Sequence, residues 1–128
     1  NLVMDADHFK KINDSYGHHA GDIVLRSLSL VALEQKRAQD TFGRLGGEEF
    51  GLILPETGLE QAKIVADRIQ TVWEKTPSIM DGMLIRSTVS VGVAEADVDD
   101  KTFDDILRRA DLRMYKAKEQ GRNQVVSE

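Results

Sequence analysis

Two acidic side chains stand where they could share a metal ion. Asp5 follows the short apolar stretch Leu2–Met4, and Glu48 lies in the segment Gly46–Glu49, between two stretches typical of strands. If those strands are neighbours, both carboxylates converge on one hard cation. Oxygen ligands without a nearby His or Cys favour Mg²⁺ or Mn²⁺ over Zn²⁺. The alternative is that Asp5 is an ordinary turn residue and Glu48 belongs to a merely solvated hairpin.

The glycines beside these acids add to the pattern. Glycine is used where a backbone takes a positive φ or approaches a bulky group closely. A hairpin alone explains one glycine easily. Gly46 and Gly47, followed at once by Glu48 and Glu49, suggest that a phosphate and its metal lie across the turn.

The periodicity of apolar residues predicts the elements that would position these groups. Helical spacing predicts three helices, at about 22–37, 59–75 and 102–120. Strand-like patterns occur at 2–4, 41–45, 50–54, 83–94 and 124–126, and a loop composition at 13–21. Strands and helices that intermix around a hairpin predict an α/β (α+β) fold, with a mostly antiparallel central sheet flanked by helices.

The composition is that of one globular domain. The chain has 128 residues, 41% of them hydrophobic and 30% charged, which suits one core and is too short for two domains. A net charge of −5 does not attract a nucleic acid polymer, although a metal-bound nucleotide is compatible with it. The absence of cysteine fits a cytoplasmic location, and no apolar run is long enough for a membrane helix. Whether the parent protein is membrane-anchored stays open.

The turn Gly46-Gly47-Glu48-Glu49-Phe50 resembles the signature of the GGDEF family in its GGEEF form. Other family blocks follow in order along essentially the whole chain: Met4–Asp14, Gly17-His18, Gly21-Asp22, Ser90–Ala94, Ala110-Asp111, Met114–Lys118 and Gly121–Asn123. The chain thus resembles diguanylate cyclase domains, which join two GTP molecules into cyclic di-GMP. The resemblance implies a fold similar to nucleotidyl cyclases and the polymerase palm.

By this resemblance, Asp5 and Glu48 would bind Mg²⁺ or Mn²⁺ together with the backbone carbonyl of Ala6. Family members usually carry a larger aliphatic residue at Ala6, which a carbonyl ligand tolerates. Glu49 would support the metal site or accept the proton of the attacking hydroxyl. The reaction would be in-line attack of a ribose 3′-oxygen on the α-phosphorus of a second GTP, which expels pyrophosphate.

Asn13 and Asp22 match the family's guanine-reading residues. Guanine presents donors at N1 and N2 and an acceptor at O6, which an amide and a carboxylate complement. From the residues alone, Asp22 is as well explained as the N-cap of the helix at 22–37, and Asn13 as a turn former.

Lys10, Lys118 and Arg122 match the positions that hold the GTP phosphates. Lys118 and Arg122 are four residues apart at the expected end of the last helix, so they could project to the same side. The alternative is a solvated basic helix end, which the helix dipole favours. The backbone before the next helix, around His8 and Phe9, and the glycines Gly46 and Gly47 would also contact GTP.

Arg37 and Asp40 form an Arg-x-x-Asp arrangement six residues before the turn, counted from Asp40 to Gly46. In the family this placement marks an inhibitory site for the product cyclic di-GMP, to which Arg68 on the next helix would contribute. Arg37 could pair with a phosphate or a guanine edge through two bonds. The alternative is an exposed salt bridge, worth at most about 1 kcal/mol.

The resemblance also implies partners. One domain would hold one GTP, so catalysis would need a homodimer, and a sensor domain would precede the domain in the parent protein. The family's first helix, with a Leu-Thr-x-Leu-x-Asn-Arg block, is absent, so residues 1–128 are expected to be the domain without its N-terminal segment. Two alternatives stay open: a non-enzymatic member that only binds GTP or cyclic di-GMP, and an adenylate-type cyclase, against which Asn13 and Asp22 argue.

Overall fold

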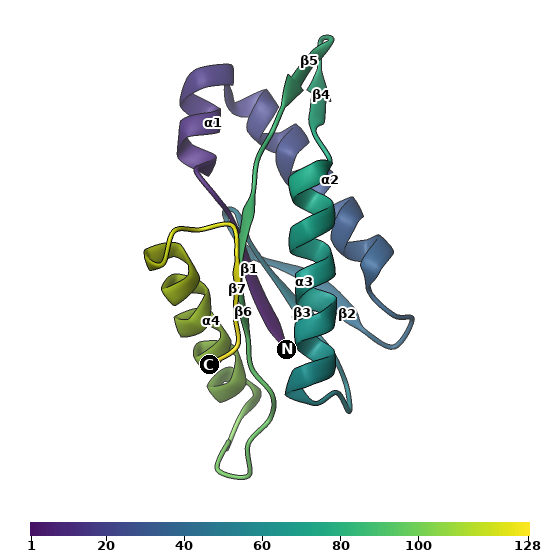
Figure 1. Cartoon of the computed structure of the whole chain (residues 1–128), viewed down its shortest axis with the longest axis vertical. Coiled ribbons are helices and arrows are strands. Elements are labelled where there is room, and N and C mark those ends of the chain that lie inside the picture. The colour runs from purple at the N-terminus through teal and green to yellow at the C-terminus, as the bar shows by residue number, and fades with distance from the viewer.

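A five-stranded sheet in the order β2-β3-β1-β6-β7 forms the centre of the molecule (Figure 1). The structure, a computed structural model, describes residues 1–128. Its strands are β1 (Leu2–Ala6), β2 (Thr41–Gly46), β3 (Glu49–Ile53), β4 (Ser78–Met80), β5 (Met83–Ile85), β6 (Val89–Val93) and β7 (Val125–Val126). Its helices are α1 (Phe9–Tyr16), α2 (His18–Gln35), α3 (Leu59–Lys75) and α4 (Phe103–Glu119).

The central strand β1 pairs antiparallel with β3 on one side and β6 on the other. β7 pairs parallel with β6, so the sheet is mixed. The predicted α/β fold is confirmed, with this one parallel pair added to an otherwise antiparallel sheet. β4 and β5 form a separate two-stranded hairpin that extends from one end of the molecule in Figure 1.

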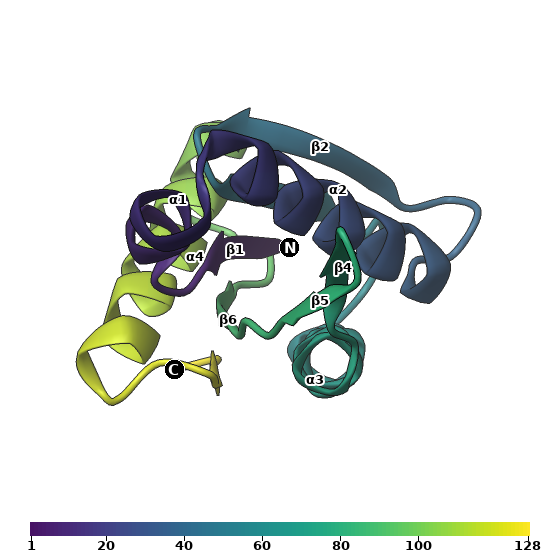
Figure 2. The same ribbon diagram turned by 90° about the horizontal axis from the view of Figure 1, so that it is seen from above.

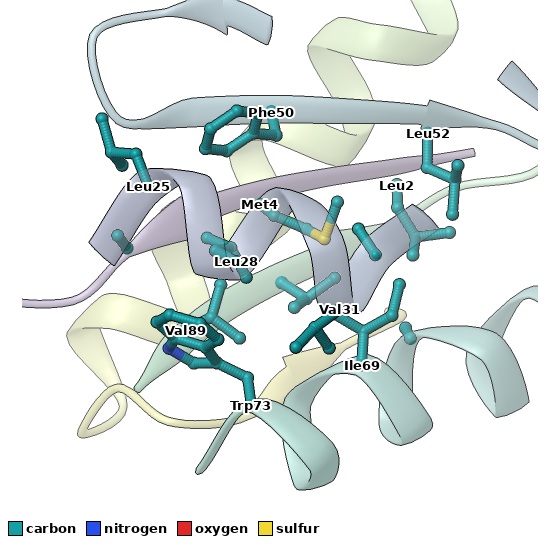
Figure 3. Close-up of a cluster of buried hydrophobic side chains, with 14 of the residues drawn as sticks. Leu2, Met4, Leu25, Leu28, Val31, Phe50, Leu52, Ile69, Trp73 and Val89 are labelled. Carbon is teal, nitrogen blue, oxygen red and sulfur yellow. The ribbon is translucent and has the colours of Figure 1, made fainter. Parts of the chain in front are cut away.

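Helices cover both faces of the sheet, and all five residues of β1 are buried as a result. On one face, α2 and α3 contribute side chains such as Leu28 and Trp73 to a large apolar core (Figure 3). On the other face, α4 packs against Val3 through Ala110 and Met114. Figure 2 shows α4 and α3 on opposite sides of β6. The end of β1, with its acidic residues, is therefore held rigidly from both sides.

α4 lies directly against β6 at Gly92. A Cβ atom at this position would lie 1.9 Å from the backbone oxygen of Ala110 and 2.3 Å from the backbone nitrogen of Met114. Only glycine permits this approach. The close packing fixes α4, and with it Lys118 near its end, relative to the sheet.

Three local expectations were wrong. The region 13–21 is not a loop, because α1 ends at Tyr16 and α2 begins at His18, and Gly17 alone turns the chain with φ 92°. The strand expected at 83–94 is two strands, β5 and β6, that belong to different sheets. The helix expected at 22–37 begins four residues earlier, at His18, and ends at Gln35.

Candidate functional site

The end of β1 and the β2–β3 turn bring three carboxylates together. The backbone nitrogen of Ala6 donates to the backbone oxygen of Glu48 at 3.2 Å. Asp5 lies directly opposite Glu49 in the antiparallel register of β1 and β3. The two strands are therefore neighbours, which was the condition for Asp5 and Glu48 to converge.

The backbone of the turn takes a conformation that requires glycine. Gly47 has φ 44°, and the register shifts between Arg44 and Gly46, which is a bulge. Arg44 stabilises this shape because its Nε and Nη2 donate to the carbonyl of Gly47 at 2.9 and 2.5 Å. A Cβ at Gly46 or Gly47 would meet nothing within 4 Å, so the space over the turn is open.

Lys118 of α4 reaches the acidic end of β1. Its Nζ lies 2.9 Å from Oδ1 of Asp5 and 3.1 Å from Oδ1 of Asp7. Burial raises the pKa of Asp5, whose residue is only 8% exposed, and the ammonium of Lys118 opposes that rise. Glu48 and Asp7 add repulsion that again favours the protonated acid.

Glu49 is the most perturbed acid of the site. Burial, a hydrogen bond with Asp111 and repulsion from Asp111, Asp5 and Glu48 together raise its pKa to about 7. Four carboxyl groups therefore crowd a region that contains one close ammonium, that of Lys118. A bound cation would relieve this repulsion.

The donors of the site fit Mg²⁺ or Mn²⁺ better than Zn²⁺. The acids are near one another, but no three side chains of His, Asp or Glu form a group that could hold a metal by themselves. Asp5, Glu48 and the backbone carbonyl of Ala6 would offer hard oxygen ligands, and water and phosphate would supply the others. This is the ligand balance that Mg²⁺ prefers in phosphoryl-transfer sites.

Asn13 and Asp22 lie on neighbouring helices beside this site. A Cβ at Gly21 would come within 1.9 Å of Asn13 Oδ1, so the amide of Asn13 on α1 packs against α2 next to Asp22. Asn13 Oδ1 is buried and has no hydrogen-bond partner in the chain. Asp22 is exposed and lines a groove of about 430 Å³ between α2, β2 and β3, together with Leu25 and Phe42.

The capping interpretation of Asp22 was wrong. α2 begins at His18 with Gly17 as its N-cap, so Asp22 already lies within the helix. Its carboxylate accepts no hydrogen bond from the backbone of the first turn and is available to a ligand.

Of the basic residues expected to bind phosphate, Lys10 and Arg122 are exposed, whereas the side chain of Lys118 is mostly buried. Lys10 is exposed in the first turn of α1, after His8, whose φ of 54° turns the chain into that helix. Phe9 begins α1 and is half-buried. Neither Lys10 nor Arg122 forms an ion pair within the chain.

Arg122 does not lie on α4, so its helical spacing from Lys118 does not apply. The helix ends at Glu119, and the next residues form a Schellman turn. Arg122 N donates to Ala117 O at 2.9 Å and Gly121 N to Lys118 O at 3.4 Å. Gly121 has φ 121°, the positive φ that ends the helix in such a turn. Arg122 is exposed with φ 66°.

Arg37 and Asp40 form a close pair at the opposite end of β2 from the turn. Arg37 donates from Nη2 to Asp40 Oδ1 at 2.9 Å and from Nε to Oδ2 at 3.1 Å, and its backbone nitrogen donates to Oδ2 at 2.8 Å. The six residues of β2 place the pair roughly 20 Å from the turn. Asp40 is only 4% exposed, so the pair is not the fully exposed salt bridge considered as the alternative.

The side chain of Asp40 is ionised, and its hydrogen bonds hold the guanidinium of Arg37 in one orientation. Burial alone would raise the pKa of Asp40, but hydrogen bonds and charge from Arg37 lower it below its usual range. Arg37 Nη2 also donates to Thr57 Oγ1 at 2.5 Å. Arg68 is exposed on α3, and the structure gives it no hydrogen bond or ion pair to Arg37 or Asp40.

Four residues at these sites had no role in the sequence interpretation: Asp7, Arg44, Thr57 and Asp111. Asp7 and Asp111 stand inside the blocks that resemble the family, but spacing does not show that they face Lys118 and Glu49. Arg44 binds the carbonyl of Gly47 and Thr57 binds Arg37, and both contacts form only when the hairpin and the segment before α3 are folded. No sequence signal would have identified these two.

Comparisons with known proteins agree with the fold. The family described as "Diguanylate cyclase, GGDEF domain" matches residues 1–124. Diguanylate cyclase A of Treponema denticola is 42% identical over 124 residues, which cover 97% of this chain and 33% of that protein. The response regulator PleD of Caulobacter vibrioides is 42% identical over 127 residues, 98% of this chain and 28% of that protein. The chain thus spans about a third of these relatives.

Solved structures show the same fold. The active GGEEF domain of a diguanylate cyclase from Vibrio cholerae superposes with a TM-score of 0.91 at 34% identity, over 98% of this chain and 80% of that one. The GGDEF domain of DgcB from Caulobacter crescentus, solved in complex with c-di-GMP, gives a TM-score of 0.92 at 30% identity, over 98% of this chain and 75% of that one. This chain belongs to the diguanylate cyclase GGDEF domain family, whose members are nucleotidyltransferase-type enzymes.

Proposed function

We propose that this domain condenses two GTP molecules into cyclic di-GMP and two pyrophosphates. The observation that carries the proposal is the convergence of Asp5, Glu48 and Glu49 where β1 ends beside an open glycine turn. Crowded, partly buried acids next to the open space over the glycine turn suit a metal-assisted phosphoryl transfer. Glu49, with a pKa near 7, is suited to accept the proton of the attacking hydroxyl.

Asp5 and Glu48, with the carbonyl of Ala6, would hold Mg²⁺ or Mn²⁺ here. A bound ion would supply charge neutralisation for the triphosphate and the departing pyrophosphate. The protein's own contribution is to hold these oxygens fixed between α4 and the hairpin turn, and to place Lys118 beside them.

The substrate would lie between α1, α2 and the turn. Asn13 and Asp22 would read guanine, and the exposed carboxylate of Asp22 on the groove between α2, β2 and β3 supports this because it can accept from the guanine donors. Lys10, Lys118 and Arg122 would neutralise the phosphates. The backbone near His8, Phe9, Gly46 and Gly47 would approach the nucleotide closely, since the glycine turn leaves that space open.

Product would bind at Arg37 and Asp40 and inhibit the enzyme. The pair supports this role because a buried, ionised Asp40 holds the Arg37 guanidinium in one orientation. Arg68 would join from α3 when cyclic di-GMP bridges the two elements. The c-di-GMP complex of the related DgcB domain is consistent with such binding in the family.

Catalysis would require two copies of the domain, because each site would hold one GTP and the reaction joins two. A sensor domain in the same polypeptide and a cytoplasmic location belong to this proposal too. The relatives, of which this chain spans about a third, leave room for further domains. Within the structure, no helix combines the length and the apolar character needed to cross a membrane.

Guanine reading is tested by Asp22→Ala. The variant should lose roughly tenfold or more of its affinity for GTP but little of its affinity for ATP, because a charged hydrogen bond to the guanine edge is lost. Its stability should stay within about 0.5 kcal/mol of the parent, since Asp22 is exposed and caps nothing. Calorimetric titration and urea unfolding measure the two effects.

Glu34→Ala is the matched control, because Glu34 is an exposed carboxylate on the same helix. It should leave both affinities unchanged. An Asp22→Ala protein that is folded and still prefers GTP over ATP by the parental ratio would show that Asp22 does not read guanine.

A further inference from the structure

Asp7 is the most completely engaged carboxylate in the molecule. The residue is 1% exposed, and four donors reach its two oxygens. Ser90 Oγ donates at 2.6 Å and Lys118 Nζ at 3.1 Å to Oδ1. Thr88 Oγ1 at 2.7 Å and the backbone nitrogen of Asn123 at 3.0 Å donate to Oδ2.

These four donors occupy both oxygens of the buried carboxylate. A buried charge with every lone-pair direction used is costly to move. Asp7 is therefore a fixed point in the structure.

The donors come from separate parts of the chain. Thr88 directly precedes β6 and Ser90 lies near the start of that strand, Lys118 lies in the last turn of α4, and Asn123 lies in the turn that follows α4. Asp7 thus fastens the end of α4 to the end of β1. Neither interaction can be read from the position of Asp7 in the sequence, because the partners are more than eighty residues away.

Lys118 is shared between Asp7 and Asp5. Its Nζ is 2.9 Å from Asp5 and 3.1 Å from Asp7, and its side chain is mostly buried. A lysine has four rotatable bonds, so an ammonium held by one carboxylate alone is poorly fixed. If Asp5 also binds a cation, Asp7 is the carboxylate that still holds the ammonium of Lys118.

We propose that Asp7 is a positioning residue, which holds the ammonium of Lys118 beside Asp5 so that it meets the phosphates of the bound nucleotide. The inference rests on the proposed function, since that function gives Lys118 its phosphate. Asp7 itself does not touch the nucleotide, because its oxygens are already occupied by protein donors.

Asp7→Asn separates positioning from structural support. The amide keeps the size of the side chain, loses its charge and cannot accept from four donors at once. Affinity for GTP with Mg²⁺ should fall about tenfold. Affinity for guanosine, which has no phosphate, should be unchanged, whereas general damage to the domain would weaken both. Calorimetric titration measures GTP, and ligand-observed NMR measures guanosine.

Two further variants sharpen the comparison. Lys118→Met should also lose GTP affinity, and adding Asp7→Asn to it should cause no further loss, because Asp7 acts through Lys118. Asp99→Asn removes an exposed carboxylate on the loop before α4 and should change neither affinity. Additive losses in the double variant would overturn the proposal.

Thr88→Val is a milder substitution, and this variant should fold more readily than Asp7→Asn. It removes one hydroxyl donor and leaves the charge of Asp7 in place, so GTP affinity should fall about two- to threefold with guanosine binding unchanged. If neither Asp7→Asn nor Thr88→Val weakens GTP binding selectively, Asp7 does not position Lys118. A parent chain that binds no GTP would contradict the proposed function itself, which is a distinct outcome.

Discussion

Glu48→Gln is expected to abolish the formation of cyclic di-GMP while the domain stays folded. The amide keeps the shape of the turn but removes a negative ligand that faces the metal and the triphosphate. Loss of several kcal/mol of transition-state stabilisation corresponds to a rate lower by roughly a thousandfold or more. Product formation from GTP and Mg²⁺, followed by chromatography, measures the rate, and circular dichroism measures the fold.

Glu34→Gln serves as the control for the Glu48 variant, because it makes the same substitution at an exposed position of α2. Its rate should equal that of the parent. A folded Glu48→Gln protein that still produced cyclic di-GMP at a near-parental rate would refute the metal assignment.

Arg37→Ala is expected to keep the initial rate of turnover and to lose inhibition by added cyclic di-GMP. The variant removes a guanidinium that can pair through two bonds with a phosphate or a guanine edge. Such a charged contact is typically worth about 1.5–3 kcal/mol, or roughly ten- to a hundredfold in product affinity. Inhibition in the parent should be non-competitive with GTP, since the pair lies roughly 20 Å from the catalytic turn.

Two companion variants separate binding from stability at this position. Arg37→Ala leaves the buried carboxylate of Asp40 without its partner, so it should also destabilise the domain. Arg37→Lys keeps a positive charge for Asp40 but cannot form the paired contact, so it should be more stable and still escape inhibition. Arg86→Ala, at an exposed arginine between β5 and β6, should remain as sensitive as the parent. If cyclic di-GMP inhibits Arg37→Ala as strongly as the parent, Arg37 and Asp40 do not form a product site.

The sequence predicted the elements whose apolar pattern is set by one buried face. α3 follows its predicted range closely, because its periodicity reflects contact with one core. The β2–β3 hairpin also follows its predicted range, although β2 is exposed along most of its length. α1 was missed because it is only eight residues long and buries only one side chain, Ile12, so too few apolar residues mark it as a helix. The same oversight placed the start of α2 at Asp22 and led to the incorrect capping role.

Tertiary contacts explain what the sequence could not show at the site. Local spacing indicated that Asp5 and Glu48 could converge if their strands were neighbours, and β1 and β3 are paired. It did not indicate that Lys118 would pair with Asp5 and Asp7, because the packing of α4 on Gly92 determines that contact. Arg122 was misplaced for a local reason: the helix stops one turn earlier than the four-residue spacing assumes.

The most direct test is to incubate the chain with GTP and Mg²⁺, at a protein concentration high enough for two copies to meet, and to identify the products by mass spectrometry. Cyclic di-GMP and pyrophosphate should form in a ratio of one to two, with no cyclic product from ATP. Omission of the divalent ion should stop the reaction. A chain that binds GTP under these conditions but releases no cyclic di-GMP would contradict the proposed catalysis and indicate a nucleotide-binding domain instead.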